Sequence, residues 1–447
     1  MIMKSFLALL GVALVVAGAA SAGDITVHKS GRYFQDANGK PFFFIGYYCW
    51  ASVAPGFYNE APQTYEEMIV KGAENKARYV RFSLGINRLG GSGDYVNKYT
   101  PVPFVYENGK ANLDKLDPVF WAGLKYHCEQ ADKYGAILHV CLFDGVDFRG
   151  GNVNWRWVGS YWNVKNQTRD FYGDLDLDHD GNTDVAGEFY RLADFKNDTG
   201  VGKYQRRVID KAVSIVNGYN NVFLELGNEL MDSPADWNDE VARYVKARTK
   251  KAITQSGGRL GLTVSGFSEH NPDTPAMVRE ELPGMVGWGT PAWLDPDGSK
   301  LGRGSADDLR RSVWFSFTGG AAGWGGFNGG YARKRPDLDT LKYYGNLSRF
   351  IEETGIKFWE MLPWQAMVLN NKTNTCLVKL GKEYVVYALE DAKVWVNLSS
   401  IYGKAAVRIY NPKTGRFSPE QIIDAAGTRR FDKPAGMEDW VIYIKAL

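Results

Sequence analysis

The sequence predicts an α/β fold, a (β/α)8 TIM barrel followed by a small antiparallel β-sandwich. The chain has 447 residues, enough for a barrel of about 250 residues and a second module. From about residue 40 to residue 360, short apolar runs alternate with longer amphipathic stretches, as parallel strands alternate with crossover helices. Beyond residue 365 the runs are short and β-like and are separated by turn residues, which is typical of a β-sandwich.

The apolar runs and the residues between them predict the order of the barrel elements. Helix caps are expected at Thr64, at Asp117 and at Ser305, and Gly135 is expected to end the second helix. After residue 265 the periodicity weakens, so the sixth strand has no clear run of its own. The predicted strands are residues 42–46, 79–84, 136–143, 221–229, 259–265, 286–294 as the seventh and 319–326 as the eighth, with a closing helix at 338–353.

Composition and the first residues limit the class of protein. The chain is 45% hydrophobic and 23% charged with a formal net charge of +2, so it is globular and lacks the basic surface that attracts nucleic acid. Residues 1–22 combine Lys4, an apolar run and a small-residue ending, which predicts a cleaved signal peptide and a secreted protein, extracellular or periplasmic. That run is too short for a membrane anchor, and no later segment could span a bilayer. The predicted domains are the signal peptide 1–22, the barrel 23–365 and the β-sandwich 366–447.

Glu229 is the best-placed acid for chemistry. It ends the predicted fourth strand, at the carboxyl edge where barrels place their active sites. Glu225 shares a face of that strand with Glu229 but lies one layer deeper. A deep carboxylate needs a cation, and Arg81 on the second strand is suited to that role, so we expect a buried Arg81–Glu225 ion pair. The alternative for Glu229 is a solvated loop acid or a helix-capping group.

These residues resemble a motif of the clan A glycoside hydrolases, retaining barrel enzymes that include many cellulases and mannanases. The resemblance implies that Glu229 is the general acid/base, that Asn228 binds the sugar 2-hydroxyl and that Arg81 supports the nucleophile. More narrowly, the chain looks like a bacterial group labelled as collagenases, which are similar to clan A glycosidases with a small C-terminal β-domain. The residues that resemble these two groups of proteins are 79–81, 221–230, 319–323 and 410–415.

The resemblance also implies a second carboxylate, a Glu at the end of the seventh strand, where this sequence has an Asp-Pro-Asp-Gly segment instead. We expect Asp297, and next Asp295, to supply it as the nucleophile of a retaining enzyme, while an inverting base stays open. Glu269, after the predicted fifth strand, is a third candidate, and His270 beside it is placed to orient a carboxylate. The alternative is that the Asp-Pro-Asp-Gly segment only forms a turn.

Aromatic residues near strand ends are candidates for stacking on sugar rings. Trp324 on the last strand is expected to form the floor of a subsite. The alternative for each tryptophan is core packing. His139, which alternates with apolar neighbours inside the third strand, is expected to be a core histidine. The tryptophans near predicted strand ends are Trp50, Trp288, Trp293 and Trp324.

An acidic segment in the long stretch after the third strand has the alternating acids and central glycine of a calcium loop. Its twelfth position is Gly187 rather than the bidentate Glu of an EF-hand, with Glu188 one residue later. We expect a structural calcium ion there and no cofactor for catalysis; the alternative is an acidic surface turn. The candidate ligands are Asp176, Asp178, Asp180 and Asp184.

Taken with the resemblance, the position of Glu229 predicts a secreted, monomeric glycoside hydrolase that acts on a poly- or oligosaccharide. The alternative is a catalytically inactive protein that keeps the groove and binds carbohydrate. A metallopeptidase would need a His-Glu-x-x-His motif, which the five histidines do not provide. A serine hydrolase would need the second glycine of a nucleophile elbow, which residues 266–270 lack.

Overall fold

The structure is a computed structural model of the whole chain. It describes residues 24–49, 64–84, 102–148, 160–163, 166–168, 189–230, 233–256, 266–270, 292–295, 305–326, 338–369 and 373–447. For some of these, including 266–270 and 292–295, it describes the backbone alone. None of the helices within these ranges is long and apolar enough to cross a membrane.

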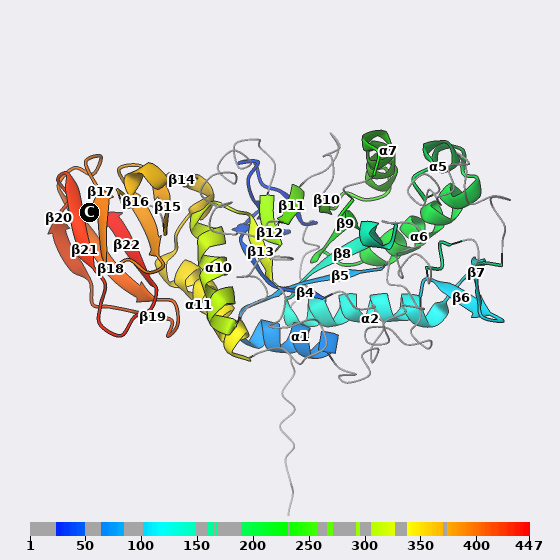
Figure 1. Cartoon of the computed structure of the whole chain (residues 1–447), viewed down its shortest axis with the longest axis horizontal. Helices are drawn as coiled ribbons and strands as arrows, with labels where there is room; N and C mark the ends of the chain where they lie inside the picture. The colour runs from blue at the N-terminus through cyan, green and yellow to red at the C-terminus, as the bar shows by residue number, and fades with distance from the viewer. Residues whose placement is uncertain are drawn as a thin grey trace, which may run out of the picture.

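Parallel strands close into an eight-stranded barrel, as the sequence predicts (Figure 1). The ring closes where the last strand, β13, pairs with the first, β4. Around the barrel the strands are β4 (Phe44–Cys49), β5 (Tyr79–Ser83), β8 (Ile137–Asp144), β9 (Val222–Asn228), β10 (Ile253–Ser256), β11 (Gly266–His270), β12 (Ala292–Asp295) and β13 (Gly323–Gly326). The helices described around it are α1 (Thr64–Glu74), α2 (Pro118–Tyr134), α5 (Leu192–Asn197), α6 (Gly200–Val216), α7 (Ala235–Lys246), α10 (Ala306–Thr318) and α11 (Leu338–Thr354).

The first four strands and the eighth lie where the sequence predicts them, but the fifth does not. The fifth strand is β10, which pairs with β9 on one side and β11 on the other and precedes the predicted run 259–265. Three of its four residues are polar, so no apolar run marks it in the sequence. Glu269 and His270 therefore end the sixth strand, β11, instead of following the fifth. The seventh strand, β12, overlaps the predicted range and ends at Asp295.

Predicted helix caps are confirmed where their side chains are described. The carboxylate of Asp117 accepts hydrogen bonds from the backbone N–H groups of Val119 (2.8 Å) and Phe120 (3.2 Å) at the start of α2. Gly135 ends this helix in the left-handed conformation that favours glycine, with φ of 62°. Ser305 forms a capping box at the start of α10. These local signals therefore fix where the helices on the outside of the barrel begin and end.

Aromatic rings fill the barrel interior toward the amino ends of the strands. Phe44 stacks on Tyr79 with ring centroids 4.4 Å apart, and Phe223 stacks on His139 at 4.0 Å. Gly323 faces these rings, and a Cβ added there would lie 2.4 Å from the ring of Phe44. The eighth strand is rich in glycine because the aromatic side chains of its neighbours occupy the space that its own side chains would need.

The C-terminal region is a β-sandwich, as predicted. A larger sheet has the order β14-β15-β16-β22-β18-β19, with β20 paired to β18, and β17 and β21 form a smaller sheet. Alternate side chains of the two sheets enclose a common apolar core. The strands are β14 (Leu362–Pro363), β15 (Asn374–Lys379), β16 (Glu383–Ala388), β17 (Lys393–Asn397), β18 (Lys404–Asn411), β19 (Arg416–Phe417), β20 (Gln421–Asp424), β21 (Thr428–Asp432) and β22 (Trp440–Ala446).

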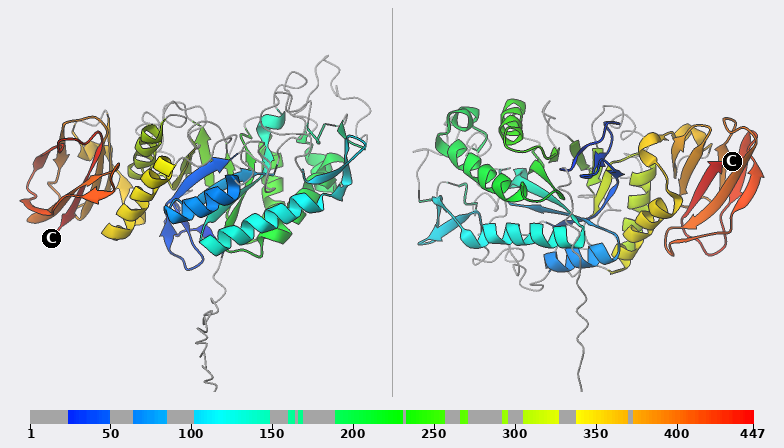
Figure 2. Two further views of the ribbon diagram at one scale, coloured as in Figure 1. Left: turned by 90° about the horizontal axis from the view of Figure 1, so that it is seen from below. Right: turned by 180° about the vertical axis from the view of Figure 1, so that it is seen from behind.

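The larger sheet packs directly against the barrel. Figure 2 shows α10 and α11 lying between the barrel strands and this sheet. Tyr387 of β16 contacts Phe315 of α10 edge to face at 4.9 Å, and Tyr443 of β22 contacts Phe350 of α11 at 5.7 Å. These rings belong to the same apolar core as the barrel interior. The larger sheet is thus covered on one face by helices and on the other by the smaller sheet.

Candidate active site

Glu229 lies directly after β9, at the carboxyl-terminal rim of the barrel. Every residue of β9 is buried, whereas Glu229 is partly exposed. Its φ of 49° is left-handed, which costs a non-glycine residue about 1–3 kcal/mol and is concentrated at functional sites. Gly145, just after β8, packs against this turn, and a Cβ added to it would lie 2.4 Å from the carbonyl oxygen of Glu229. The backbone therefore turns sharply at Glu229 and holds it at the rim.

A buried polar network lies directly below Glu229. Arg81 donates from Nε and Nη2 to the two carboxylate oxygens of Glu225, at 2.6 and 2.7 Å, which confirms the predicted ion pair. Its Nη2 also donates to Oδ1 of Asn228 at 2.9 Å, and Nδ2 of Asn228 donates to Asp144 at 3.1 Å. All four side chains are buried. Because a guanidinium only donates and a carboxylate only accepts, these partners fix the orientation of the Asn228 amide.

Asp144 is a member of the network that the sequence did not predict. It is the last residue of β8 and pairs in register with Asn228, so two polar residues end neighbouring strands at the same rim. The signal was present, because an acid directly follows the apolar run of the third strand. It was hidden because Asp144 also begins the long segment that the sequence predicts to be a loop. We place Asp144 in the candidate site beside Asn228.

His139 is a buried core residue, as predicted. Its Nδ1 lies 2.8 Å from the hydroxyl of Tyr79 and its Nε2 lies 2.6 Å from the hydroxyl of Thr254. Thr254 donates onward to the carbonyl of Leu224, so it accepts from Nε2–H, and Nδ1 accepts from Tyr79. Burial, and next the charge of Arg81, hold the pKa of His139 well below its ordinary value of 6.5. His139 is therefore neutral and fixes one layer of the barrel interior.

The low pKa of His139 predicts a pH dependence of stability. Below pH 6.5 the unfolded chain binds a proton at this residue and the folded protein does not. The free energy of unfolding therefore decreases as the pH is lowered, by up to about 1.4 kcal/mol per pH unit. His139→Gln should be less stable at pH 7, and the difference in unfolding midpoint from the wild type should narrow between pH 6.5 and pH 5. Urea unfolding of both proteins between pH 7 and pH 5 measures this difference. The other histidines are the same in both proteins, so parallel curves of stability against pH would contradict the prediction.

The backbone places the other predicted rim residues around the same barrel mouth. Asp295 ends β12, in register with His270 at the end of β11. Since β12 is three strands around the ring from β9, Asp295 lies at the rim well across from Glu229. Asp297, the first-choice second carboxylate, and Trp50 lie outside the described residues. The backbone thus brings Asp295 and His270 to the rim of Glu229.

Trp324 does not fit its predicted role. Its neighbour Gly323 faces the barrel interior, so Trp324 points outward toward the helices. Its indole Nε1 donates to the hydroxyl of Tyr344 on α11 at 2.9 Å, and the side chain is 0% exposed. A fully buried indole has no face to offer a sugar ring, so core packing is the correct interpretation for Trp324.

The predicted calcium loop lies outside the described residues. Within the described part of the chain, no group of three or more His, Cys, Asp or Glu side chains is arranged to hold a metal ion. The polar side chains described at the candidate site are carboxylates, an amide and a guanidinium. The loop ligands Asp176, Asp178, Asp180 and Asp184 stay a prediction.

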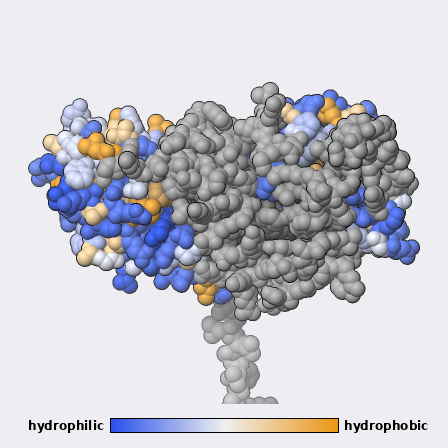
Figure 3. All heavy atoms as spheres, in the orientation of Figure 1, coloured by the Kyte–Doolittle hydropathy of each residue, from blue (hydrophilic) through white to orange (hydrophobic). Residues whose placement is uncertain are grey.

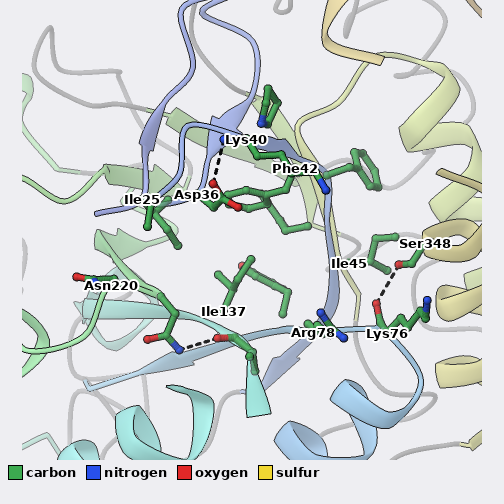
Figure 4. A pocket seen from close by; sticks show the side chains of 18 of the residues that line it. Ile25, Asp36, Lys40, Phe42, Ile45, Lys76, Arg78, Ile137, Asn220 and Ser348 are labelled. Carbon is green, nitrogen blue, oxygen red and sulfur yellow. Dashed lines mark hydrogen bonds between the residues drawn. The ribbon is translucent and has the colours of Figure 1, made fainter. Parts of the chain in front are cut away.

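A cavity of about 660 Å³ lies at the opposite end of the barrel (Figure 4). It is lined by the amino-terminal ends of the first strands, including Ile45 and Ile137, by Asp36 and Phe42 near the chain start, and by Arg78 before β5. Barrel enzymes place their chemistry at the carboxyl-terminal end, and Glu229 lies there. We therefore do not assign this cavity to the candidate active site.

Known structures share this architecture. A protein described as "Glycoside hydrolase" aligns with 95% of this chain and 97% of its own, with a TM-score of 0.66 and 15% identity. A glycoside hydrolase family 5 protein from Bacteroides vulgatus aligns with 95% of this chain and 94% of its own, with a TM-score of 0.67 and 14% identity. A family 5 mannosidase from Rhizomucor miehei aligns with 75% of this chain and 100% of its own, with a TM-score of 0.51 and 13% identity. The chain therefore has the fold of these glycoside hydrolases, as the resemblance implies.

Sequence comparison identifies only the β-sandwich. Residues 362–445 match the family described as "Putative collagen-binding domain of a collagenase", which agrees with the narrower resemblance seen in the sequence. No curated protein matches the chain. The coverage of the first two structures spans both the barrel and the β-sandwich, so the pairing of these two domains is itself shared.

Proposed function

We propose that the protein is a glycoside hydrolase that cleaves O-glycosidic bonds of a poly- or oligosaccharide, with Glu229 as its general acid/base. The observation that supports this most directly is the strained, partly exposed Glu229 at the carboxyl rim of a glycosidase-fold barrel. The network beneath it orients Asn228, whose Nδ2 has two protons and gives one to Asp144. The resemblance implies that Asn228 binds a sugar 2-hydroxyl, and because this side chain is 0% exposed, it must become accessible when substrate binds.

The proposed reaction is retaining and needs a second carboxylate at about 5–5.5 Å from the first. Glu229 donates its proton to the leaving glycosidic oxygen while the second carboxylate attacks the anomeric carbon and forms a glycosyl ester. Glu229 then takes a proton from the water that hydrolyses this ester. Asp295 and Asp297 are the candidates for the second carboxylate. In an inverting enzyme the same residues would lie about 6.5–9.5 Å away and activate water instead.

The same proposal includes where the protein works and what it binds. We infer secretion after removal of residues 1–22, a monomeric enzyme and a structural calcium ion held by the acids of residues 176–184. These inferences rest on sequence pattern. Mass spectrometry of the secreted chain, sedimentation and metal analysis of the purified protein test each of them separately.

Glu229→Gln tests the proposal. On an aryl glycoside or polysaccharide that the wild type cleaves, kcat should fall at least about 100-fold, because Gln cannot donate the proton. Glu129→Gln, which removes an exposed acid of α2, is the matched control and should keep full activity. Asp295→Asn and Asp297→Asn identify the second carboxylate, and NMR of the first-formed anomer separates retention from inversion.

Two results would contradict the proposal. Unchanged turnover in Glu229→Gln would remove Glu229 as the acid/base. Polysaccharide binding by a wild type that cleaves none of a broad substrate panel would support the alternative, an inactive carbohydrate-binding protein. The departure from Glu at the end of the seventh strand, where Asp295 stands, is the observation that keeps this alternative in the test.

A further inference from the structure

The smaller sheet of the β-sandwich has one face that no other element of the described chain covers. Its inward side chains, Val394 and Val396 of β17 and Phe431 of β21, pack into the core of the sandwich. The larger sheet, in contrast, is covered on both faces, by α10 and α11 and by the smaller sheet. Of the four sheet faces in this domain, the outer face of β17 and β21 is therefore the one against which no helix or sheet of the described chain packs.

An exposed tryptophan lies at the centre of this outer face. Trp395 is 37% exposed and stands directly opposite Arg430 in the register of the two strands. On its other side, the bridge between Val368 and Val396 brings Leu369 opposite Trp395, and Leu369 is 63% exposed. With neighbouring strands about 4.8 Å apart, the row formed by Leu369, Trp395 and Arg430 is roughly 10 Å wide. We call this row and its polar neighbours the Trp395 face.

Polar groups surround the indole on the Trp395 face. The guanidinium of Arg430 donates from Nη2 to a carboxylate oxygen of Asp432 at 2.9 Å. Asn397 and Thr428 pair in register on the same side of the sheet. The side chain of Asn397 accepts from the N–H of Ser399, which leaves its amide N–H groups pointing at no described residue. The indole is thus bordered by both donors and acceptors.

The chemistry of the Trp395 face fits a sugar ring. A pyranose has an apolar C–H face, which stacks on an indole, and hydroxyls around its edge, which need donors and acceptors. The charged residues of this face are two cations, Lys393 and Arg430, and one anion, Asp432, so its net charge is small and does not favour a strongly charged polymer. The visible surface of this domain is mainly hydrophilic with small apolar patches (Figure 3), unlike a broad hydrophobic protein interface.

We propose that the Trp395 face is a second carbohydrate-binding site, which holds a polysaccharide chain at a distance from the barrel groove. The sugar class rests on the proposed function of the barrel, because a polymer held at the β-sandwich raises the local concentration of the same polymer at the groove. The open face points away from α10 and α11, so a bound chain of many residues can extend past the barrel without a steric block from this domain.

Binding to soluble polysaccharides in native affinity gels tests this site, with Glu229→Gln as the parent so that the polymer stays intact. Adding Trp395→Ala to this parent should raise the dissociation constant about tenfold for at least one of β-mannan, xylan and β-glucan. Trp395→Phe keeps a ring and should lose much less. Adding Trp364→Ala instead removes a tryptophan of similar exposure, 41%, outside the Trp395 face and should change binding less than about twofold.

Three results would overturn different parts of the proposal. Equal binding by the parent and Trp395→Ala, or retardation by no polysaccharide, would overturn the second site. Trp395-dependent binding to collagen fibrils but to no polysaccharide would overturn the sugar assignment in favour of the protein ligand named for the matching family. Failure of the wild type to hydrolyse any glycoside, with Trp395-dependent polysaccharide binding intact, would overturn the proposed function and leave the second site standing.

Discussion

Arg81→Met is expected to lower the free energy of unfolding by about 3–5 kcal/mol. The side chain of Arg81 is 1% exposed, and its removal leaves the fully buried carboxylate of Glu225 without its cation. Asn228 also loses the donor that holds its Oδ1. A carboxylate in that position must then be protonated or draw water into the barrel, and both cost free energy. Thermal and urea unfolding of the purified variant measure the loss.

Two further variants separate the buried pair from a general effect of removing arginine. The double variant Arg81→Met/Glu225→Leu removes both charges and should recover most of the lost stability, because apolar groups replace the whole pair. Arg243→Met breaks an exposed pair with Glu240 on α7 and should cost less than about 1 kcal/mol. If the Arg81 variant were as stable as the Arg243 variant, the ion pair would not be the element that holds this part of the barrel.

Most of the fold could be predicted because its signals are local. The cap at Asp117, the stop at Gly135 and the capping box at Ser305 each need only a few neighbouring residues. The fifth strand was missed because the inward side chain of Thr254 bonds to His139 and to the Leu224 carbonyl. A strand whose interior partners are polar does not show the apolar run by which strands are recognised.

Prediction of the site succeeded where one strand contains the information and failed where strands must be combined. Glu225 and Asn228 lie on β9 and Glu229 directly follows it, so spacing along one strand already gives their order in depth. Asp144 joins them only through the register of β8 with β9. Trp324 points outward because its neighbour Gly323 must face the ring of Phe44, where a side chain would not fit. This depends on packing between neighbouring strands. Neither fact can be read from spacing along the chain.

The second large effect is expected at the contact between barrel and β-sandwich. Arg310 on α10 is 0% exposed, and its Nη2 lies 2.8 Å from the carboxylate of Asp439, which is 1% exposed. The other oxygen of Asp439 accepts from the hydroxyl of Tyr387 at 2.9 Å. Arg310→Met should lower stability by about 3–5 kcal/mol, because the Asp439 carboxylate stays buried without a cation.

The loss at Arg310 should appear as a loss of cooperativity between the two domains. The apolar core of the barrel continues through α10 and α11 into the larger sheet, so we expect the wild type to unfold in one calorimetric transition. In Arg310→Met the contact is weakened on the sandwich side, and a separate, earlier transition should appear. Arg311→Met, at the next residue, removes a 30% exposed side chain that also reaches Glu438 and should leave one transition.

Arg310→Met/Asp439→Leu provides the decisive comparison. If the buried charge causes the loss, the double variant should regain a single transition, because no charge then stays buried without a partner. Tyr387 loses its carboxylate acceptor, which costs less, about 1–3 kcal/mol. One unsplit transition in Arg310→Met would instead mean that the remaining contacts, among them the aromatic contacts of Phe315 and Phe350, are enough to couple the domains. In either case the β-sandwich is anchored to the barrel through its larger sheet, and the Trp395 face lies on the smaller sheet, on the side away from α10 and α11.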